Sequence, residues 1–284
     1  MKPGTVSKIL WHFTGGPERD GSHNQKTQPK DAKVSYEILK LILQSKFLKL
    51  SSKEEIIKVI IPKETNFDKI EKKRIVSYNV EKRIKSSKVF CLADIPIQHL
   101  EYHAQRYGKI AIGFYRETII KKEFNPVLYS LQNTSLLNSF YAGFTSISNI
   151  DTENIKDEIS TIDDDFKDVI SEIEDNDIEL DSDKDISDHI SNIESECQDI
   201  DNATLRVEQS LEDFVAFIKT FDKNEFDTIY CEREWRSLKQ FDFSFDDIAM
   251  ILIPRENNFY NDLLKMNLVP NNIPIIPWED IIEH

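Results

Sequence analysis

The sequence Thr228-Ile229-Tyr230-Cys231-Glu232-Arg233-Glu234-Trp235-Arg236 places two glutamates two positions apart. Its residue types predict a strand, in which alternate side chains point to opposite faces of a sheet. Glu232, Glu234 and Arg236 would then share one face, and a pair of carboxylates aimed at a cleft suits chemistry on a cationic transition state. The alternative is an exposed edge strand whose charges are solvated, and these nine residues alone do not exclude it.

The rest of the chain reads as short apolar strands with a few helices between them. Alternation and apolar runs predict strands at residues 7–13, 47–50, 89–92, 109–115, 126–130, 247–253 and 273–276. Apolar residues at helical spacing predict helices at 34–45, 97–107, 205–221 and 258–266, whereas 52–85 are compatible with either. This order predicts an α+β fold with a mixed or antiparallel central sheet and flanking helices.

The negative charge of the chain is concentrated in one segment. Residues 151–202 hold 21 Asp or Glu against three Lys, whereas the 284-residue chain as a whole has a net charge of −15. Isoleucines recur there at helical spacing, so we expect an acidic insert that is helical or partly disordered. Residues 1–150 and 203–284 would together form one α+β domain. The insert would dock a basic partner, cover a cleft, mimic nucleic acid or have no role.

Cysteine content and hydropathy bear on the cellular compartment. The three cysteines are widely spaced and form no CxxC motif, so we expect neither a disulfide framework nor a zinc site. His99 and His103 are four residues apart on a predicted helix, but no third ligand accompanies them, and we expect no metal. No apolar run reaches the ~18–20 residues of a membrane helix. These observations predict a soluble, cytoplasmic protein without membrane contact.

Three blocks carry a resemblance to a known family: Trp11-His12-Phe13-Thr14, the segment 90–129, and Glu232-Arg233-Glu234-Trp235-Arg236. In this order they resemble the AbiGi family of abortive-infection proteins, which act in bacterial anti-phage systems and are usually labelled antitoxins of a two-gene pair. The resemblance covers under a third of the residues and includes no counterpart of the acidic insert. It implies a role in phage defence and a toxin or antitoxin partner protein.

A more distant resemblance concerns the mechanism. A His-x-Thr-Gly first strand followed by a late Glu-x-Glu strand is similar to the ADP-ribosyltransferase fold, although its Ser-Thr-Ser motif is missing. The resemblance implies that NAD is a substrate, that His12 binds its ribose, and that Thr14 or Gly15 lies beside nicotinamide. Glu234 would be the catalytic glutamate and Glu232 its helper, with a protein or nucleic acid as acceptor. Three tyrosines are candidates for stacking on nicotinamide: Tyr107, Tyr115 and Tyr129.

Two functions therefore remain open. The protein is either an NAD-dependent ADP-ribosyltransferase or a non-catalytic antitoxin that binds a partner toxin. For the enzyme, we expect one carboxylate of the pair to have a raised pKa, because like charges repel. Arg236 is expected to form a salt bridge to Glu232 or Glu234, and Asp94 to cap the helix that follows it. The enzyme requires His12 and Glu234 to face a common cleft.

Overall fold

The computed structural model describes residues 7–17, 28–50, 54–68, 73–132, 134–148, 152–174, 183–225 and 229–282. The chain forms two compact units. Unit 1 consists of Met1–Lys58, Lys85–Gln132 and Val215–His284, and unit 2 of Val59–Ile84 and Asn133–Phe214. We predicted one domain of residues 1–150 and 203–284 with an insert of 151–202. The two units do not test which parts of the chain fold independently, so this partition stays a prediction.

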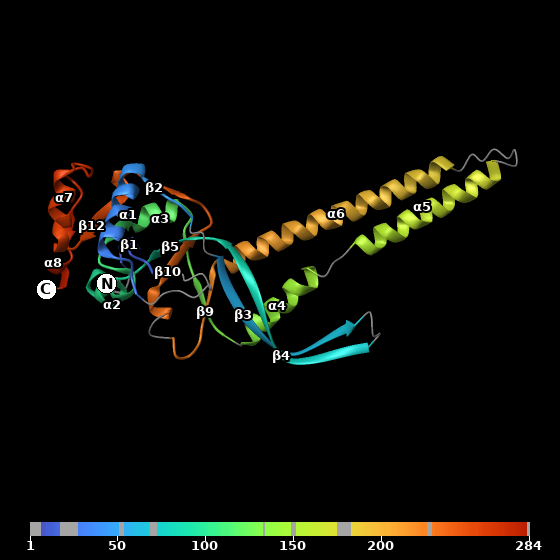
Figure 1. Cartoon of the computed structure of the whole chain (residues 1–284), viewed down its shortest axis with the longest axis horizontal. Coiled ribbons are helices and arrows are strands. Elements are labelled where there is room, and N and C mark those ends of the chain that lie inside the picture. Colours follow the sequence, from blue (N-terminus) through green and yellow to red (C-terminus); the bar gives the residue numbers. More distant parts are fainter. Residues whose placement is uncertain are drawn as a thin grey trace. The chain divides into compact units, whose positions relative to one another are not determined.

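Unit 1 is built on a seven-stranded sheet with the order β13-β12-β6-β1-β5-β10-β7 (Figure 1). Neighbouring strands are antiparallel except β12 and β13, which are parallel, so the predicted mixed sheet and α+β class are confirmed. The strand bounds are β1 (Ile9–Phe13), β5 (Phe90–Ala93), β6 (Ala111–Tyr115), β7 (Asn125–Pro126), β10 (Glu234–Ser237), β12 (Ile248–Ile253) and β13 (Ile275–Pro277).

Both faces of this sheet are covered, as the sequence of β1 requires. Leu10 and Trp11 are successive strand residues that point to opposite faces, and both are fully buried. Leu10 belongs to a core with side chains of α1 (Ala32–Ser45), α3 (Arg116–Lys121) and α7 (Phe259–Lys265). Trp11 belongs to a second core with α2 (Leu100–Tyr107) and residues next to α8 (Glu279–Ile282). The central strand is therefore held in place from both sides.

Three two-stranded sheets complete the strand pairing. They are β2 (Phe47–Leu48) with β11 (Phe241–Asp242), β8 (Leu128–Leu131) with β9 (Ile218–Phe221), and β3 (Glu54–Asp68) with β4 (Lys73–Lys88). The ambiguous segment 52–85 thus forms strands in its described part. The predicted helix 205–221 is wrong beyond Val215, because residues 218–221 pair as β9 with β8 in parallel register. Four short 3-10 turns are η1 (Ile97–His99), η2 (Tyr230–Glu232), η3 (Phe245–Asp247) and η4 (Glu256–Asn258).

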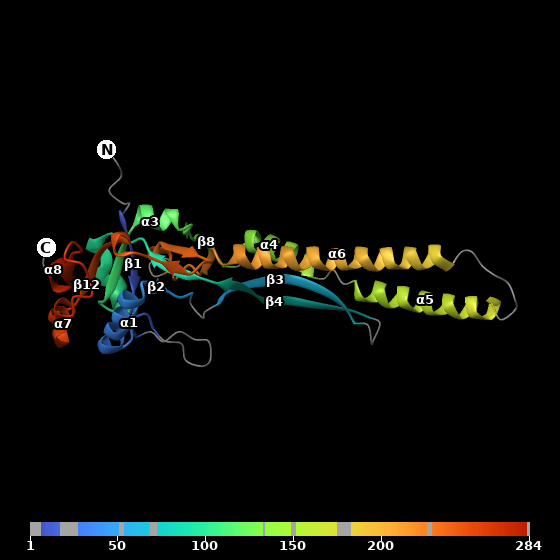
Figure 2. The same ribbon diagram turned by 90° about the horizontal axis from the view of Figure 1, so that it is seen from above.

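Unit 2 contains α4 (Ser135–Ser148), α5 (Glu153–Glu174) and α6 (Asp183–Val215). Helices α5 and α6 run antiparallel and side by side in both views (Figures 1 and 2). Thr152 Oγ1 and Lys156 Nζ each contact Asp201 at 2.5 Å, which fixes one end of this pair. The described part of the predicted acidic insert is therefore helical. Among the described residues, no helix is both long and apolar enough to cross a membrane.

Candidate functional site

The strand that we predicted around Glu232 begins later than expected. Tyr230–Glu232 form the 3-10 turn η2, Arg233 adopts the left-handed conformation with φ 43°, and β10 starts only at Glu234. Thr228, the predicted start, lies outside the described residues. The simple alternation is therefore wrong at Glu232, and the neighbouring Cys231 is exposed. The turn at Arg233 nevertheless leaves Glu232 and Glu234 in one polar network.

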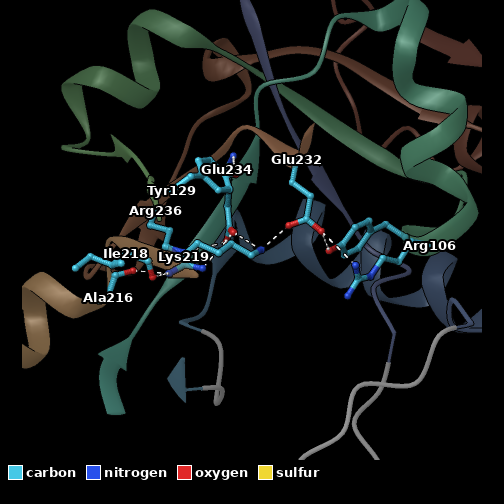
Figure 3. A network of polar contacts seen from close by, with 9 residues as sticks. Arg106, Tyr129, Ala216, Ile218, Lys219, Glu232, Glu234 and Arg236 are labelled. Carbon is cyan, nitrogen blue, oxygen red and sulfur yellow. Dashed lines mark hydrogen bonds and ion pairs between the residues drawn. The ribbon is translucent and has the colours of Figure 1, made fainter. Parts of the chain in front are cut away.

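Glu234 lies between two cations, Arg236 and Lys219 (Figure 3). Its Oε1 accepts a hydrogen bond from Arg236 Nε at 3.0 Å, and its Oε2 lies 2.7 Å from Lys219 Nζ. The predicted salt bridge of Arg236 to one of the glutamates is thus confirmed. Arg236 is fully buried, and its Nη1 also donates to the backbone oxygen of Ala216 at 2.6 Å. These bonds satisfy a guanidinium whose burial would otherwise be costly.

Glu232 takes its partners from the other side of the same network. Lys219 Nζ contacts Glu232 Oε2, so this ammonium group bridges both carboxylates. Tyr107 Oη donates to Glu232 Oε1 at 2.9 Å, and Arg106 Nη1 lies 3.5 Å from the same oxygen. Both glutamates are less than 10% exposed. The network therefore joins the end of α2, strand β9 and the start of β10.

The pKa directions follow from this pairing. Burial alone would raise the pKa of Glu234, but the charges of Lys219 and Arg236 outweigh it and hold that pKa well below its ordinary value. Burial likewise opposes the charge on Lys219, but Glu234 and Glu232 raise its pKa well above the ordinary range. The expected rise of one carboxylate pKa is therefore not seen at Glu234, because a cation lies between the two acids.

A cavity of about 390 Å³ opens on this network within unit 1. Its walls include His12, Tyr107, Glu232 and Glu234, together with Arg106 and Lys219. This volume falls in the range of small-molecule sites. His12 and Glu234 therefore face a common cavity, although 222 positions separate them in the sequence.

Two histidines of this cavity are held in their neutral form. Burial lowers the pKa of His12 to about 4, and its ring packs on Phe90 at 5.1 Å between centroids. Burial, with the charges of Lys219 and Arg106, lowers the pKa of His103 to about 3. His103 stacks on Tyr107 at 4.3 Å between ring centroids. At neutral pH both imidazoles can therefore accept a hydrogen bond from a ligand.

The other predicted binding residues lie elsewhere among the described residues. Thr14 is buried, and its N–H donates to Ile110 O at 3.1 Å. Gly15 packs against the end of α2, where an added Cβ would lie 2.6 Å from Tyr107 O. Tyr115 is 47% exposed, and Tyr129 Oη accepts from Glu234 N–H at 2.8 Å. None of these four residues lines the cavity, so Tyr107 is the one of the three candidate tyrosines in its wall.

Sequence reasoning missed Lys219 and Arg106 and misjudged Asp94. Lys219 lies in the stretch that we read as helix, and its buried neighbours Ile218 and Phe221 are three residues apart, a helical spacing that gives no local sign of a strand. Arg106 occupies the last turn of α2 and carried no separate signal. Asp94 does not cap the following helix; its Oδ1 accepts from Arg116 Nη2 at 2.6 Å, and Arg233 contacts its Oδ2.

Comparison with known proteins shows which family the chain matches. No curated protein matches the chain, and no solved structure matches it, so the resemblance to ADP-ribosyltransferases stays a prediction. Residues 54–279 match the family model described as "Putative abortive phage resistance protein AbiGi, antitoxin". The match covers β3 through the start of α8 and so includes most of the cavity wall. Its description points to a role in abortive phage resistance. The chain belongs to the AbiGi family.

Proposed function

We propose that this AbiGi protein acts in phage defence by binding NAD in the cavity of unit 1 and transferring ADP-ribose to an acceptor. The observation that carries the proposal is the meeting of His12, Tyr107, Glu232 and Glu234 in the wall of one cavity. These residues come from β1, α2, η2 and β10, which are far apart in the sequence. Such convergence of polar and aromatic side chains is typical of a ligand site.

Each of these groups has a role in the proposed reaction. Neutral His12 would accept a hydrogen bond from a ribose hydroxyl, and Tyr107 would stack on nicotinamide. As the bond between ribose C1′ and nicotinamide breaks, nicotinamide leaves with the electron pair and positive charge develops on the ribose. Ionised Glu234 would stabilise that charge, and Glu232 would take the proton of the acceptor as its oxygen or nitrogen bonds to C1′.

The proposed reaction requires one carboxylate oxygen of Glu234 to face the ribose instead of a cation. In this structure Lys219 and Arg236 already compensate the charge of Glu234. The phosphates of NAD carry negative charge that Lys219 and Arg106, both in the cavity wall, would attract. In our proposal Lys219 moves from the carboxylates to a phosphate, which leaves one oxygen of Glu234 facing the ribose. The acceptor would be a protein or a nucleic acid.

The direct test is transfer of labelled ADP-ribose from NAD to protein and nucleic-acid acceptors. We expect Glu234→Gln to reduce the rate about 10²–10³-fold, the cost of removing one transition-state-stabilising group. Glu234→Asp keeps the charge that Lys219 and Arg236 need, so it separates loss of chemistry from loss of folding. Glu256→Gln changes an exposed acid and is the matched control. Equal activity of Glu234→Gln and wild type would contradict the enzymatic function.

The same cluster also supports a second function, a non-catalytic antitoxin that binds a partner toxin. Glu234 is held by two cations and has a strongly lowered pKa, which is also how a purely structural carboxylate is bound. The family description contains the word antitoxin. Under this function, a His12→Ala/Glu234→Asp variant that is inactive toward NAD would still neutralise the toxin. If that variant instead loses neutralisation while it stays folded and binds the toxin, catalysis is required.

A further inference from the structure

Helices α5 and α6 of unit 2 carry an apolar pattern with the period of a coiled coil. In α5, apolar residues alternate at spacings of four and three: Ile155, Ile159, Ile162, Phe166 and Val169. In α6, the same spacing joins Ile190, Ile193, Cys197, Ile200, Thr204, Val207 and Leu211, with Thr204 as the one polar member. A repeat of this kind marks two adjacent rows on each helix.

Burial separates these two rows. In the first row, Ile159 and Cys197 are 9% and 4% exposed, and the remaining members are partly buried: Phe166, Ile190, Thr204 and Leu211. In the second row of α5, Ile155, Ile162 and Val169 are 48%, 60% and 51% exposed. The second row of α6 is similarly uncovered, with exposed fractions of 41–46%: Ile193, Ile200 and Val207. On each helix, the second row is therefore more exposed than the first.

These exposed residues differ from the scattered apolar side chains of an ordinary surface. They are large aliphatic residues that recur at every seventh position on two adjacent helices. Residues seven apart stay on nearly the same helix face, with a drift of about 20° per heptad. Single exposed apolar residues need no explanation, whereas a continuous row marks a surface on which another element packs. We call these six residues the outer rows.

Charge indicates what packs on the outer rows. Helices α5 and α6 contain 19 Asp or Glu against four Lys or Arg. Exposed acids lie beside the outer row of α5, because Glu158 and Asp165 follow Ile155 and Ile162 by three residues. A second copy of this surface would bring like charges together, which opposes self-association. A helix rich in Lys and Arg would instead find opposite charge beside the outer row of α5 and at Glu196, which follows Ile193 of α6 by three residues.

We infer that the outer rows of α5 and α6 dock an amphipathic helix of a partner protein whose apolar stripe is flanked by Lys and Arg. Apolar burial along the rows supplies affinity, and the acids supply orientation and fast association. The inference does not rest on the ligand of the cavity, since all six residues of the outer rows belong to unit 2. Its failure would therefore leave the NAD proposal unchanged.

The test uses the full-length protein and a labelled synthetic helix with Leu at the a and d positions of three heptads and Lys or Arg beside them. A second peptide of the same composition in scrambled order is the control ligand. Fluorescence anisotropy should show at least tenfold tighter binding of the heptad peptide, and the affinity should fall as salt rises. Equal affinity for both peptides would mean attraction by charge alone and would overturn the inference.

The variants locate the binding surface. Ile155→Gln/Ile162→Gln/Ile193→Gln should weaken binding of the heptad peptide at least tenfold, while Ser171→Gln/Ser195→Gln, away from the outer rows, should not. Circular dichroism checks that each variant keeps its helices. Glu158→Lys/Asp165→Lys, which changes no apolar residue, should also weaken binding. Unchanged affinity in both the triple and the charge variant would overturn the inference. So would a wild-type dimer in sedimentation that the triple variant abolishes, since a second copy would then cover the rows.

Discussion

At the scale of single residues, the buried carboxylates depend on Lys219. Its ammonium group contacts Glu232 and Glu234 at once, and both acids are less than 10% exposed. We predict that Lys219→Met lowers the free energy of unfolding by about 3–5 kcal/mol, because two buried carboxylates lose the cation that they share. Urea denaturation measures this value. Lys223→Met removes an exposed lysine from the same region and should change stability by less than about 0.5 kcal/mol.

The two histidines of the cavity predict how stability depends on pH. The unfolded chain binds protons at the ordinary histidine pKa of 6.5, whereas folding lowers the pKa of His12 to about 4 and of His103 to about 3. The contribution of these two neutral histidines to the free energy of unfolding is therefore complete above pH 6.5. It is lost as the pH falls toward their folded-state pKa values. The pKa of Glu234 is also lowered, so its contribution to stability is lost only as the pH falls below the ordinary glutamate pKa of 4.5.

We expect the free energy of unfolding to fall by about 2 kcal/mol or more between pH 6.5 and pH 4.5. Denaturation curves across this window measure the slope. His12→Gln should make the slope shallower, and His99→Gln, at an exposed position outside the cavity, is the control variant. A wild-type slope of zero in this window would contradict the assignment of neutral, buried imidazoles.

At the scale of elements, the loop after β1 packs closely on the end of α2. A Cβ added to Gly15 would lie 2.6 Å from Tyr107 O and 2.9 Å from Ser35 Oγ, whereas one added to Gly16 would lie 3.5 Å from its nearest neighbour. We predict that Gly15→Ala costs about 1–3 kcal/mol of stability and that Gly16→Ala costs much less. Thermal melting of both variants measures the difference, and equal melting temperatures would show that the loop is not tightly packed.

At the scale of the whole molecule, periodicity predicted the elements whose structure is set locally. Helices at 34–45, 97–107 and 258–266 were recognisable from apolar spacing, and α2 ends at Tyr107, the predicted last residue, before Gly108 with φ 79°. The central sheet followed from short apolar runs. The acidic insert was expected to be helical because isoleucines recur there, and its described part is helical.

The remaining features depend on contacts between distant segments. β9 was read as the end of a helix because its pairing with β8, 90 positions earlier, is invisible in local spacing. The left-handed Arg233 breaks the strand before Glu234, and a single sequence gives no sign of such a turn. Lys219 was missed for the same reason, since its role comes from two acids that follow it by 13 and 15 positions.

In our proposal, the cavity of unit 1 binds NAD through His12 and Tyr107. The most direct measurement is calorimetric titration of the full-length protein with NAD, alongside His12→Gln, Tyr107→Leu and the control His99→Gln. We predict saturable binding by wild type and the control, and at least tenfold weaker binding by His12→Gln and Tyr107→Leu when both melt like folded protein. No heat of binding up to millimolar NAD, or equal affinity in all four proteins, would contradict the account.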